Sequence, residues 1–463
     1  MRNFSLPRPQ PAISLVTEIQ FGIKLEFRAP PVAASHPWPG LSDRDRSLYY
    51  FALALQRSGL QAAFLLDKEE ETKAEGENVT LGKDSFNDTG KDIKNEDAPG
   101  AEDSQPAQVP DKYIVKTKHN PDMFIMNPQS STPWIKAGAK DNPLLRYWLL
   151  RAGAENKSEA QRQGSHLNWH PMELSSPMLR ESEANNLFPG INTAVYEIWT
   201  AHPAKLNTHY ACGLHVQVGP AVVPSLGIIA SLSQGLTQGF QRQDRGNTNR
   251  ETQAPRPTLT TLQAQRVATL VVVLEDKLLF HLCHPSRRRV HHQLSSASGL
   301  AHAPNAPACP SAEANLPTNV LTGSGPVERA IKHLWTAADI DQVQQLLSLH
   351  PRTRDKSRTT ALRITAHAHE DDGVTHAIEF CHAQAVFSQS FVDNWTRLVL
   401  TVCKAAFLPA ERFKLLETAR TAARAEDAWK TLLRVLNDFA PVNWHARSSE
   451  QFWVGYLAVQ DRK

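Results

Sequence analysis

Alternating apolar and polar residues predict strands in at least two parts of the chain. Residues 17–27 alternate and are rich in Ile, Leu and Phe, and a second alternating run covers residues 212–219. Successive side chains of a strand point to opposite faces, so this pattern is typical of a strand that buries one face. We expect the first run to be the first core strand.

The second run carries a histidine on a polar face. Its apolar face holds Leu214, Val216 and Val218, and its other face holds Gly213, His215 and Gln217. A histidine in a strand is more often a structural hydrogen-bonding residue than a ligand. Three other short segments of the chain, taken together with this one, favour a ligand role for His215.

Apolar residues at helical spacing predict helices along the rest of the chain. The first spans 43–59 and ends at Gly59, and the β-branched residues Val271 to Val273 weaken the prediction of a helix over 259–279. The Leu/Ala stripe between Phe413 and Leu436 predicts core packing. The other expected helices are 224–236, 327–333, 339–349, 392–406 and a pair within 410–439.

Three stretches are too polar for a core. Residues 67–110 are rich in Asp, Glu, Lys, Asn and Gly, and such a segment buries too little apolar surface to offset its chain entropy, which predicts a disordered insertion. Residues 241–257 and 295–325 are rich in Gln, Asn, Ser, Pro and Ala and are expected to be surface insertions or linkers.

Composition places few limits on function. The 463 residues carry a net charge of +3, and the run Arg287 to Arg289 is too short to indicate nucleic acid. No stretch approaches the roughly 20 apolar residues that span a bilayer. The five cysteines lack disulfide spacing, which favours reduced thiols and a cytoplasmic protein. We therefore expect neither a nucleic-acid nor a membrane partner.

Four segments in order resemble one family. They are residues 22–27 (GIKLEF), 173–177 (ELSSP), 212–219 (CGLHVQVG) and 377–382 (AIEFCH). In this order they resemble an amidoligase family common in fungal genomes, related to the glutamine synthetase-like carboxylate–amine ligases. The resemblance spans residues 18 to 406, with supporting matches at 284–288 and 394–395.

The resemblance implies an α+β fold in which an antiparallel β-sheet forms a funnel of glutamine synthetase-like type with helices packed outside. ATP and Mg²⁺ would bind at its floor. A small-molecule or peptide carboxylate would attack the γ-phosphate, and an amine would then displace phosphate from the acyl phosphate. The expected organisation is a tail at 1–16, the amidoligase-like domain at 17–406 and a helical C-terminal extension at 407–463.

The resemblance also assigns site residues. Mg²⁺ prefers oxygen ligands, and two carboxylates two residues apart on a strand point to one face. Glu26 and Glu379 would be catalytic. The metal ligands would be Glu26, Glu173, His215 and Glu379, and the nucleotide contacts would be His215, Gln217, Arg287 and Arg288.

The chain departs from the family at four positions. Lys24 stands where the family has a glutamate, and an ammonium cannot coordinate magnesium. Cys381 and Ala383 replace an arginine and a histidine, and Gln217 replaces another histidine. Lys24 is expected to pair with Glu26, Glu379 or both, so a structural salt bridge competes with a metal site.

Two other constellations are less favoured. Cys381 with the adjacent His382 suggests a nucleophile, but neighbours on a strand face opposite sides. The group His281, Cys283, His284, His291 and His292 suggests zinc, but lacks a second well-spaced pair and is interpreted as the basic end of a helix.

Three functions remain open. One is an active or altered amidoligase, and the second, slightly favoured because Lys24 and Cys381 change adjacent functions, is a pseudoenzyme acting as a binding or interaction module. The third is an unrelated interaction protein, which rests on the insertions and the helical tail. A protein partner belongs to the last two.

Overall fold

A computed structural model describes residues 18–32, 42–65, 115–117, 120–126, 147–153, 169–201, 206–208, 211–221, 258–302, 308–351, 353, 358–368, 374–413, 415–425, 427–440 and 444–460. The expected tail at 1–16, the insertions at 67–110 and 241–257 and the helix at 224–236 lie outside these residues.

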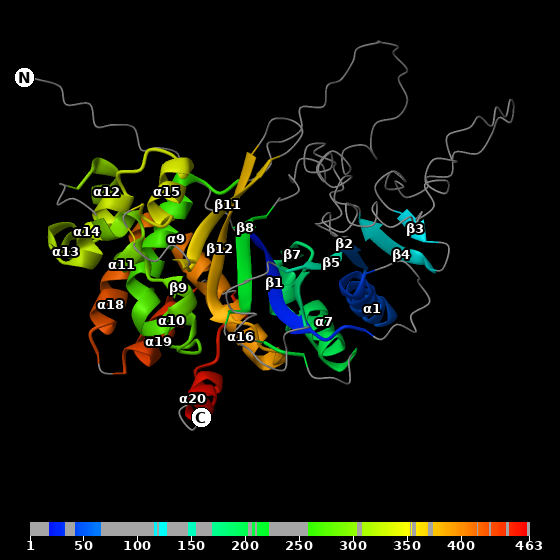
Figure 1. Cartoon of the computed structure of the whole chain (residues 1–463). Coiled ribbons are helices and arrows are strands. Elements are labelled where there is room, and N and C mark those ends of the chain that lie inside the picture. Colours follow the sequence, from blue (N-terminus) through cyan, green and yellow to red (C-terminus); the bar gives the residue numbers. More distant parts are fainter. Residues whose placement is uncertain are drawn as a thin grey trace, which may run out of the picture.

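One large sheet organises the described residues, with helices packed around it (Figure 1). Its strand order is β11-β12-β8-β1-β6-β5-β2-β4-β3, and the short β7 also pairs with β1. The strands are β1 (Ile19–Ala29), β2 (Ala62–Leu65), β3 (Val115–Thr117), β4 (Asn120–Met126), β5 (Trp148–Ala152), β6 (His170–Ser175), β7 (Leu179–Arg180), β8 (Gly213–Pro220), β11 (Leu362–Ala368) and β12 (Val374–Gln384).

The sheet is mixed, whereas an antiparallel sheet was expected. The strands from β5 through β6, β1, β8 and β12 to β11 run antiparallel, but β2 is parallel to both β4 and β5. A parallel pair needs a long connection, and the chain between β2 and β5 provides one. The pattern of side chains does not encode strand direction, which explains why the sequence missed this feature.

Helices cover the apolar face of the central strands. These are α1 (Asp43–Arg57), α7 (Pro189–Ala201) and α16 (Gln389–Ala406). Phe27 meets Phe51 of α1 edge to face at 5.6 Å between ring centroids. Phe21 meets Phe188, next to the start of α7, at 6.0 Å. The predicted strand at the N-terminus and the predicted helix 43–59, with Gly59 at φ +88°, are confirmed.

A second helical group packs beside β11 and β12 (Figure 1). Its centre is α9 (Thr261–Leu274), which begins with a Thr260 and Gln263 capping box and continues into the π-helix η5 (Glu275–Leu279). The Val271 to Val273 run is buried, so packing outweighs its weak helix propensity.

The expected helices at 327–333 and 339–349 are present as α14 (Pro326–Leu334) and α15 (Ile340–Leu347). The expected pair within 410–439 is present as α18 (Leu415–Ala422) and α19 (Ala428–Phe439), with the short α17 (Ala410–Phe413) before it and α20 (Glu450–Gln460) after it. Phe413, Leu416, Leu432 and Leu436 are buried in the main core, as the Leu/Ala stripe predicted. Within the described part of the chain, no helix is both long and apolar enough to cross a bilayer.

Residues 295–325 are more ordered than expected of a surface linker. They contribute to α11 (Leu294–Ala297), η6 (Gly299–His302), α12 (Pro310–Asn315) and α13 (Thr318–Thr322). Leu300, Leu316 and Val320 are buried in the core. These few apolar side chains, spaced among Ser, Pro and Ala, anchor short helices that average composition does not reveal.

Candidate functional site

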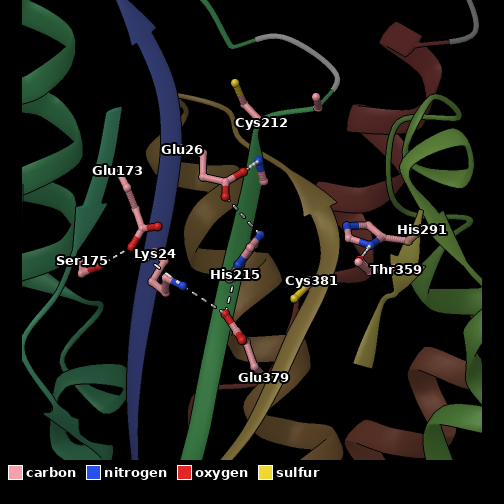
Figure 2. A network of polar contacts seen from close by, with 12 residues as sticks. Lys24, Glu26, Glu173, Ser175, Cys212, His215, His291, Thr359, Glu379 and Cys381 are labelled. Carbon is pink, nitrogen blue, oxygen red and sulfur yellow. Dashed lines mark hydrogen bonds and ion pairs between the residues drawn. The ribbon is translucent and has the colours of Figure 1, made fainter. Parts of the chain in front are cut away.

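The register of the antiparallel strands gathers charged residues on one face of the sheet. Lys24 lies opposite His215, and Glu26 lies opposite Glu173. Figure 2 shows these side chains and Glu379 projecting toward one another from β6, β1, β8 and β12. We call this surface the polar face, and its residues are Lys24, Glu26, Arg151, Glu173, His215, Gln217, Arg363, Glu379 and Cys381.

Lys24 joins two of the predicted metal ligands. Its Nζ lies 3.4 Å from Oε1 of Glu379 and 3.8 Å from Oε1 of Glu173. The expected ion pair with Glu379 is therefore present. An ammonium has no lone pair for a metal and repels a divalent cation, so these residues do not fit a Mg²⁺ ion bridging Glu173 and Glu379.

His215 lies between two carboxylates. Its Nδ1 is 3.0 Å from Oε1 of Glu379, and its Nε2 is 3.9 Å from Oε1 of Glu26. Burial by itself would lower the pKa of His215, but the Cys381 sulfur, Glu379 and Glu26 outweigh that effect and raise it to about 10. His215 is therefore a buried imidazolium at neutral pH.

Glu379 is the centre of the polar face. It is 2% exposed, and its Oε2 accepts a hydrogen bond of 2.7 Å from Nε of Arg363. Burial would raise the pKa of Glu379, but His215, Lys24 and Arg363 together lower it well below its usual value. The carboxylate stays ionised because three cations surround it.

Arg363 is a site residue that the sequence analysis did not identify. It lies directly opposite Glu379 in the β11–β12 pair. The pKa of Arg363 is raised, because Cys381 and Glu379 outweigh the effect of its burial. Its guanidinium thus reaches the Glu379 carboxylate from the neighbouring strand. In the sequence, Arg363 is a single arginine in a short strand. Such a residue indicates no role until the register of the neighbouring strand is known.

A second overlooked arginine lies at the other end of the polar face. Arg151 of β5 is opposite Glu173 and contacts its Oε1 through Nε at 2.9 Å and through NH2 at 2.6 Å. Ser175 donates to the same oxygen at 2.9 Å. The Arg151 and Arg363 side chains are 40% and 42% exposed, so both arginines also face solvent.

Glu26 is held by the backbone at Gly213. The Gly213 N–H donates to Oε2 of Glu26 at 2.8 Å. A Cβ at Gly213 would lie 2.4 Å from Nε2 of His215 and 3.1 Å from NH2 of Arg287. Glycine is therefore required here by the close approach of the His215 ring and of Arg287.

A bulge in β12 aims Cys381 at His215. The β8–β12 register shifts between Phe380 and Ala383, so Cys381 and His382 lie across from His215. The ring of His382 instead packs on Phe280 and Trp395, with Nε2 3.3 Å from Oε1 of Glu275. Cys381 is therefore partnered with His215, a pairing that sequence adjacency could not predict.

Arg287, expected as a phosphate contact, is a buried structural clasp. It is fully buried, and it donates to the carbonyl oxygens of Ala211, Cys212, Cys381 and His382 and to Nε2 of His291. These five partners among the described residues already account for the five N–H groups of a guanidinium, which leaves none for a phosphate. The clasp satisfies carbonyls that the bulge frees.

Arg288 also departs from its expected role. Its guanidinium bonds to Asp276 on η5 at 2.8 Å, and the side chain is 43% exposed. It therefore pairs with a helix carboxylate, and no contact joins it to the polar face among the described residues. Gln217, the other expected nucleotide contact, lies on the polar face and donates to Oγ1 of Thr365 at 2.9 Å.

The histidine-rich segment after η5 is structural. His291 receives the Arg287 hydrogen bond at Nε2, and its Nδ1 lies 3.0 Å from Oγ1 of Thr359. Burial, followed by the charge of Arg287, lowers the pKa of His291 to about 2. His281 stacks on Trp429, and His284 bonds to Ser286. These partners do not converge on a metal.

A cavity of about 430 Å³ lies away from the polar face. It is lined by residues of the segment 280–288 that follows η5 and by residues of α19 and α20, including Phe280, Trp429, Lys430 and Leu457. The charged constellation is therefore not located at this cavity.

Comparisons with known proteins do not place the chain in a family. No family model matches it, and neither a curated protein nor a solved structure matches it. The amidoligase resemblance rests on the four segments and the residues they carry.

Proposed function

We propose that this chain is an amidoligase-like protein of glutamine synthetase-like type. Its ancestral magnesium-dependent site has become a binding site for an anionic small molecule. The observation that carries the proposal is the position of Lys24 Nζ, within 3.8 Å of Glu173 and 3.4 Å of Glu379. A protein cation takes the role that a divalent ion has in the related ligases.

The charges of the polar face favour an anion. Four cations, Lys24, Arg151, His215 and Arg363, share three carboxylates. Arg151 and Arg363 are both partly exposed and keep guanidinium donors that suit a carboxylate or phosphate. We expect phosphate or carboxylate groups to bind there without Mg²⁺.

A second candidate, an altered but active amidoligase, is favoured by one observation. Arg363 places a guanidinium 2.7 Å from Glu379, so a cation for a transferred phosphoryl group is present although position 381 is a cysteine. This candidate requires turnover of ATP with a carboxylate and an amine.

The deciding experiment measures binding of ATP and of glutamate to chelator-treated protein, with and without added Mg²⁺, by calorimetry at low ionic strength. We expect binding without Mg²⁺ that weakens at least about tenfold in Lys24→Glu, since one charge pair near 4 Å contributes more than the roughly 1.4 kcal/mol that tenfold represents. Lys277→Glu reverses the same charge at an exposed lysine of η5 and should bind as wild type does.

Two results would count against binding without catalysis. Mg²⁺-dependent ATP hydrolysis that disappears in Glu379→Gln would establish the active ligase instead. Absence of any binding of ATP and glutamate would remove both candidates and favour an interaction protein.

A further inference from the structure

The polar face contains a mixed group of sulfur, nitrogen and oxygen ligands that the ancestral chemistry does not use. One ligand atom each from His215, Glu379 and Cys381 lies within 4.8 Å of the other two, and all three residues are buried. Cys381 replaces a cationic residue of the related ligases, so its sulfur is a new donor on this face.

From this geometry we propose that His215, Glu379 and Cys381 bind a borderline or soft divalent transition metal, with Zn²⁺ as the expected ion. Zinc takes Cys, His and carboxylate ligands at about 2.0 to 2.3 Å in tetrahedral geometry, which places the ligand atoms roughly 3 to 4 Å apart. From a separation of at most 4.8 Å, the ligand atoms need to approach one another by no more than about 1 to 2 Å to reach that spacing.

Specific atoms can be assigned from the contacts. His215 Nδ1 already lies 3.0 Å from Glu379 Oε1, so these two atoms and Cys381 Sγ form the ligand set. His215 Nε2 then faces Glu26 Oε1 at 3.9 Å, and Arg363 holds the other Glu379 oxygen at 2.7 Å. A metal-bound histidine whose second nitrogen faces a carboxylate, beside an anchored carboxylate ligand, is a recurrent arrangement.

The bulge and the charges support the same site. The register shift between Phe380 and Ala383 brings Cys381 beside His215, and bulges often re-aim side chains at functional sites. Metal binding would release one proton from His215 and one from Cys381, which offsets the two charges of the metal, and Lys24 would leave Oε1 of Glu379 while keeping its contact with Glu173. The Lys24 and Glu26 side chains are 24% and 32% exposed, so solvent or a ligand can reach the fourth metal position from their side.

The choice of metal follows from the ligand types. Thiolate and imidazole favour zinc and related ions, whereas magnesium requires oxygen ligands. The inference does not depend on the anion-binding proposal, because it concerns metal binding in the absence of nucleotide or carboxylate.

The test adds Co²⁺, a spectroscopic substitute for zinc, to chelator-treated wild-type protein. We expect one Co²⁺ per chain, a thiolate-to-cobalt charge-transfer band, tetrahedral d–d absorption and displacement by Zn²⁺ but not by excess Mg²⁺. Absence of the charge-transfer band at saturating Co²⁺ would overturn the proposal without any variant.

Variants then identify the thiol. Loss of contacts around a metal ligand costs roughly 10 to 100-fold in affinity, so loss of the ligand itself in Cys381→Ser should weaken Zn²⁺ binding at least about 100-fold. Cys403→Ser removes another buried thiol, on α16, and should bind as wild type does. A band that persists in folded Cys381→Ser would assign the metal to another cysteine and defeat the proposal.

Discussion

The polar face and the Arg287 clasp both bury charge, but they satisfy it differently. Around Glu379, opposite charges meet: Lys24, His215 and Arg363 surround one carboxylate. Around Arg287, the partners are four carbonyl oxygens and a neutral histidine. Carbonyls of the backbone cannot exchange for a ligand, whereas side-chain ion pairs can. The clasp is therefore structural, and the polar face is the region suited to function.

The largest expected effect comes from breaking the clasp. Arg287→Met leaves the buried carbonyls of Cys381 and His382 without this donor, and two unsatisfied buried acceptors at about 1–3 kcal/mol each cost about 2–6 kcal/mol together. We expect a loss near the upper end of this range in urea unfolding at pH 7. Arg288→Met, next in sequence but partly exposed, should lose at most about 1 kcal/mol. Equal losses of unfolding free energy in the two variants would show that the buried contacts of Arg287 stabilise the protein no more than an exposed arginine does.

Removing the charge of Glu379, at the centre of the polar face, should lower the unfolding free energy somewhat less than Arg287→Met does. Glu379→Gln leaves His215, Lys24 and Arg363 without a shared carboxylate, but Lys24 and Arg363 can turn toward water. We expect a loss near the lower end of about 3–5 kcal/mol in the same unfolding assay. Because the pKa of Glu379 is lowered, its contribution is present above its unfolded pKa and is lost as pH falls. The difference in unfolding free energy between wild type and Glu379→Gln should therefore become smaller in acid. A difference that does not change with pH would contradict the ion pairs.

A smaller effect tests where the two regions meet. Gly213→Ala places a methyl group 2.4 Å from His215 Nε2 and 3.1 Å from Arg287, so overpacking should cost about 1–3 kcal/mol. Gly219→Ala, on the same strand and face, has its nearest atom at 3.8 Å and should be nearly neutral. Thermal unfolding of both variants checks this difference, and a harmless Gly213→Ala would show that the two regions are loosely packed.

The two histidines should respond oppositely to pH. The pKa of His215 is raised to about 10, so its contribution is full below pH 6.5 and is lost as pH rises toward 10. The pKa of His291 is lowered to about 2, so its contribution is present above pH 6.5 and is lost as pH falls.

Urea midpoints measured in metal-free buffer from pH 5 to pH 10 check these signs. The difference in urea midpoint between wild type and His215→Gln should become smaller in alkali. The difference in urea midpoint between wild type and His291→Gln should become smaller in acid. If both differences change in the same direction, the two histidines do not belong to electrostatically different regions.

The sequence predicted the candidate residues better than their partners. Glu26, Glu173, His215 and Glu379 were found because each lies in a short recognisable segment, and the structure brings all four to one face. Arg151 and Arg363 were missed because each is an isolated arginine whose role depends on the strand beside it. Arg287 was misassigned because a basic turn looks the same whether its arginine faces solvent or backbone carbonyls.

The sequence by itself determined which helices and strands form and which residues share one face of each strand. Period-two and helical spacing specify which residues of β1 and β8 point together and where α1, α9 and α16 form, because these patterns depend on local geometry. Tertiary structure alone decided the parallel pairing of β2, the bulge that turns Cys381 toward His215, and the pairing of Lys24 with Glu173 and Glu379. These features depend on strand order and register, which join residues far apart in the chain and leave no local pattern.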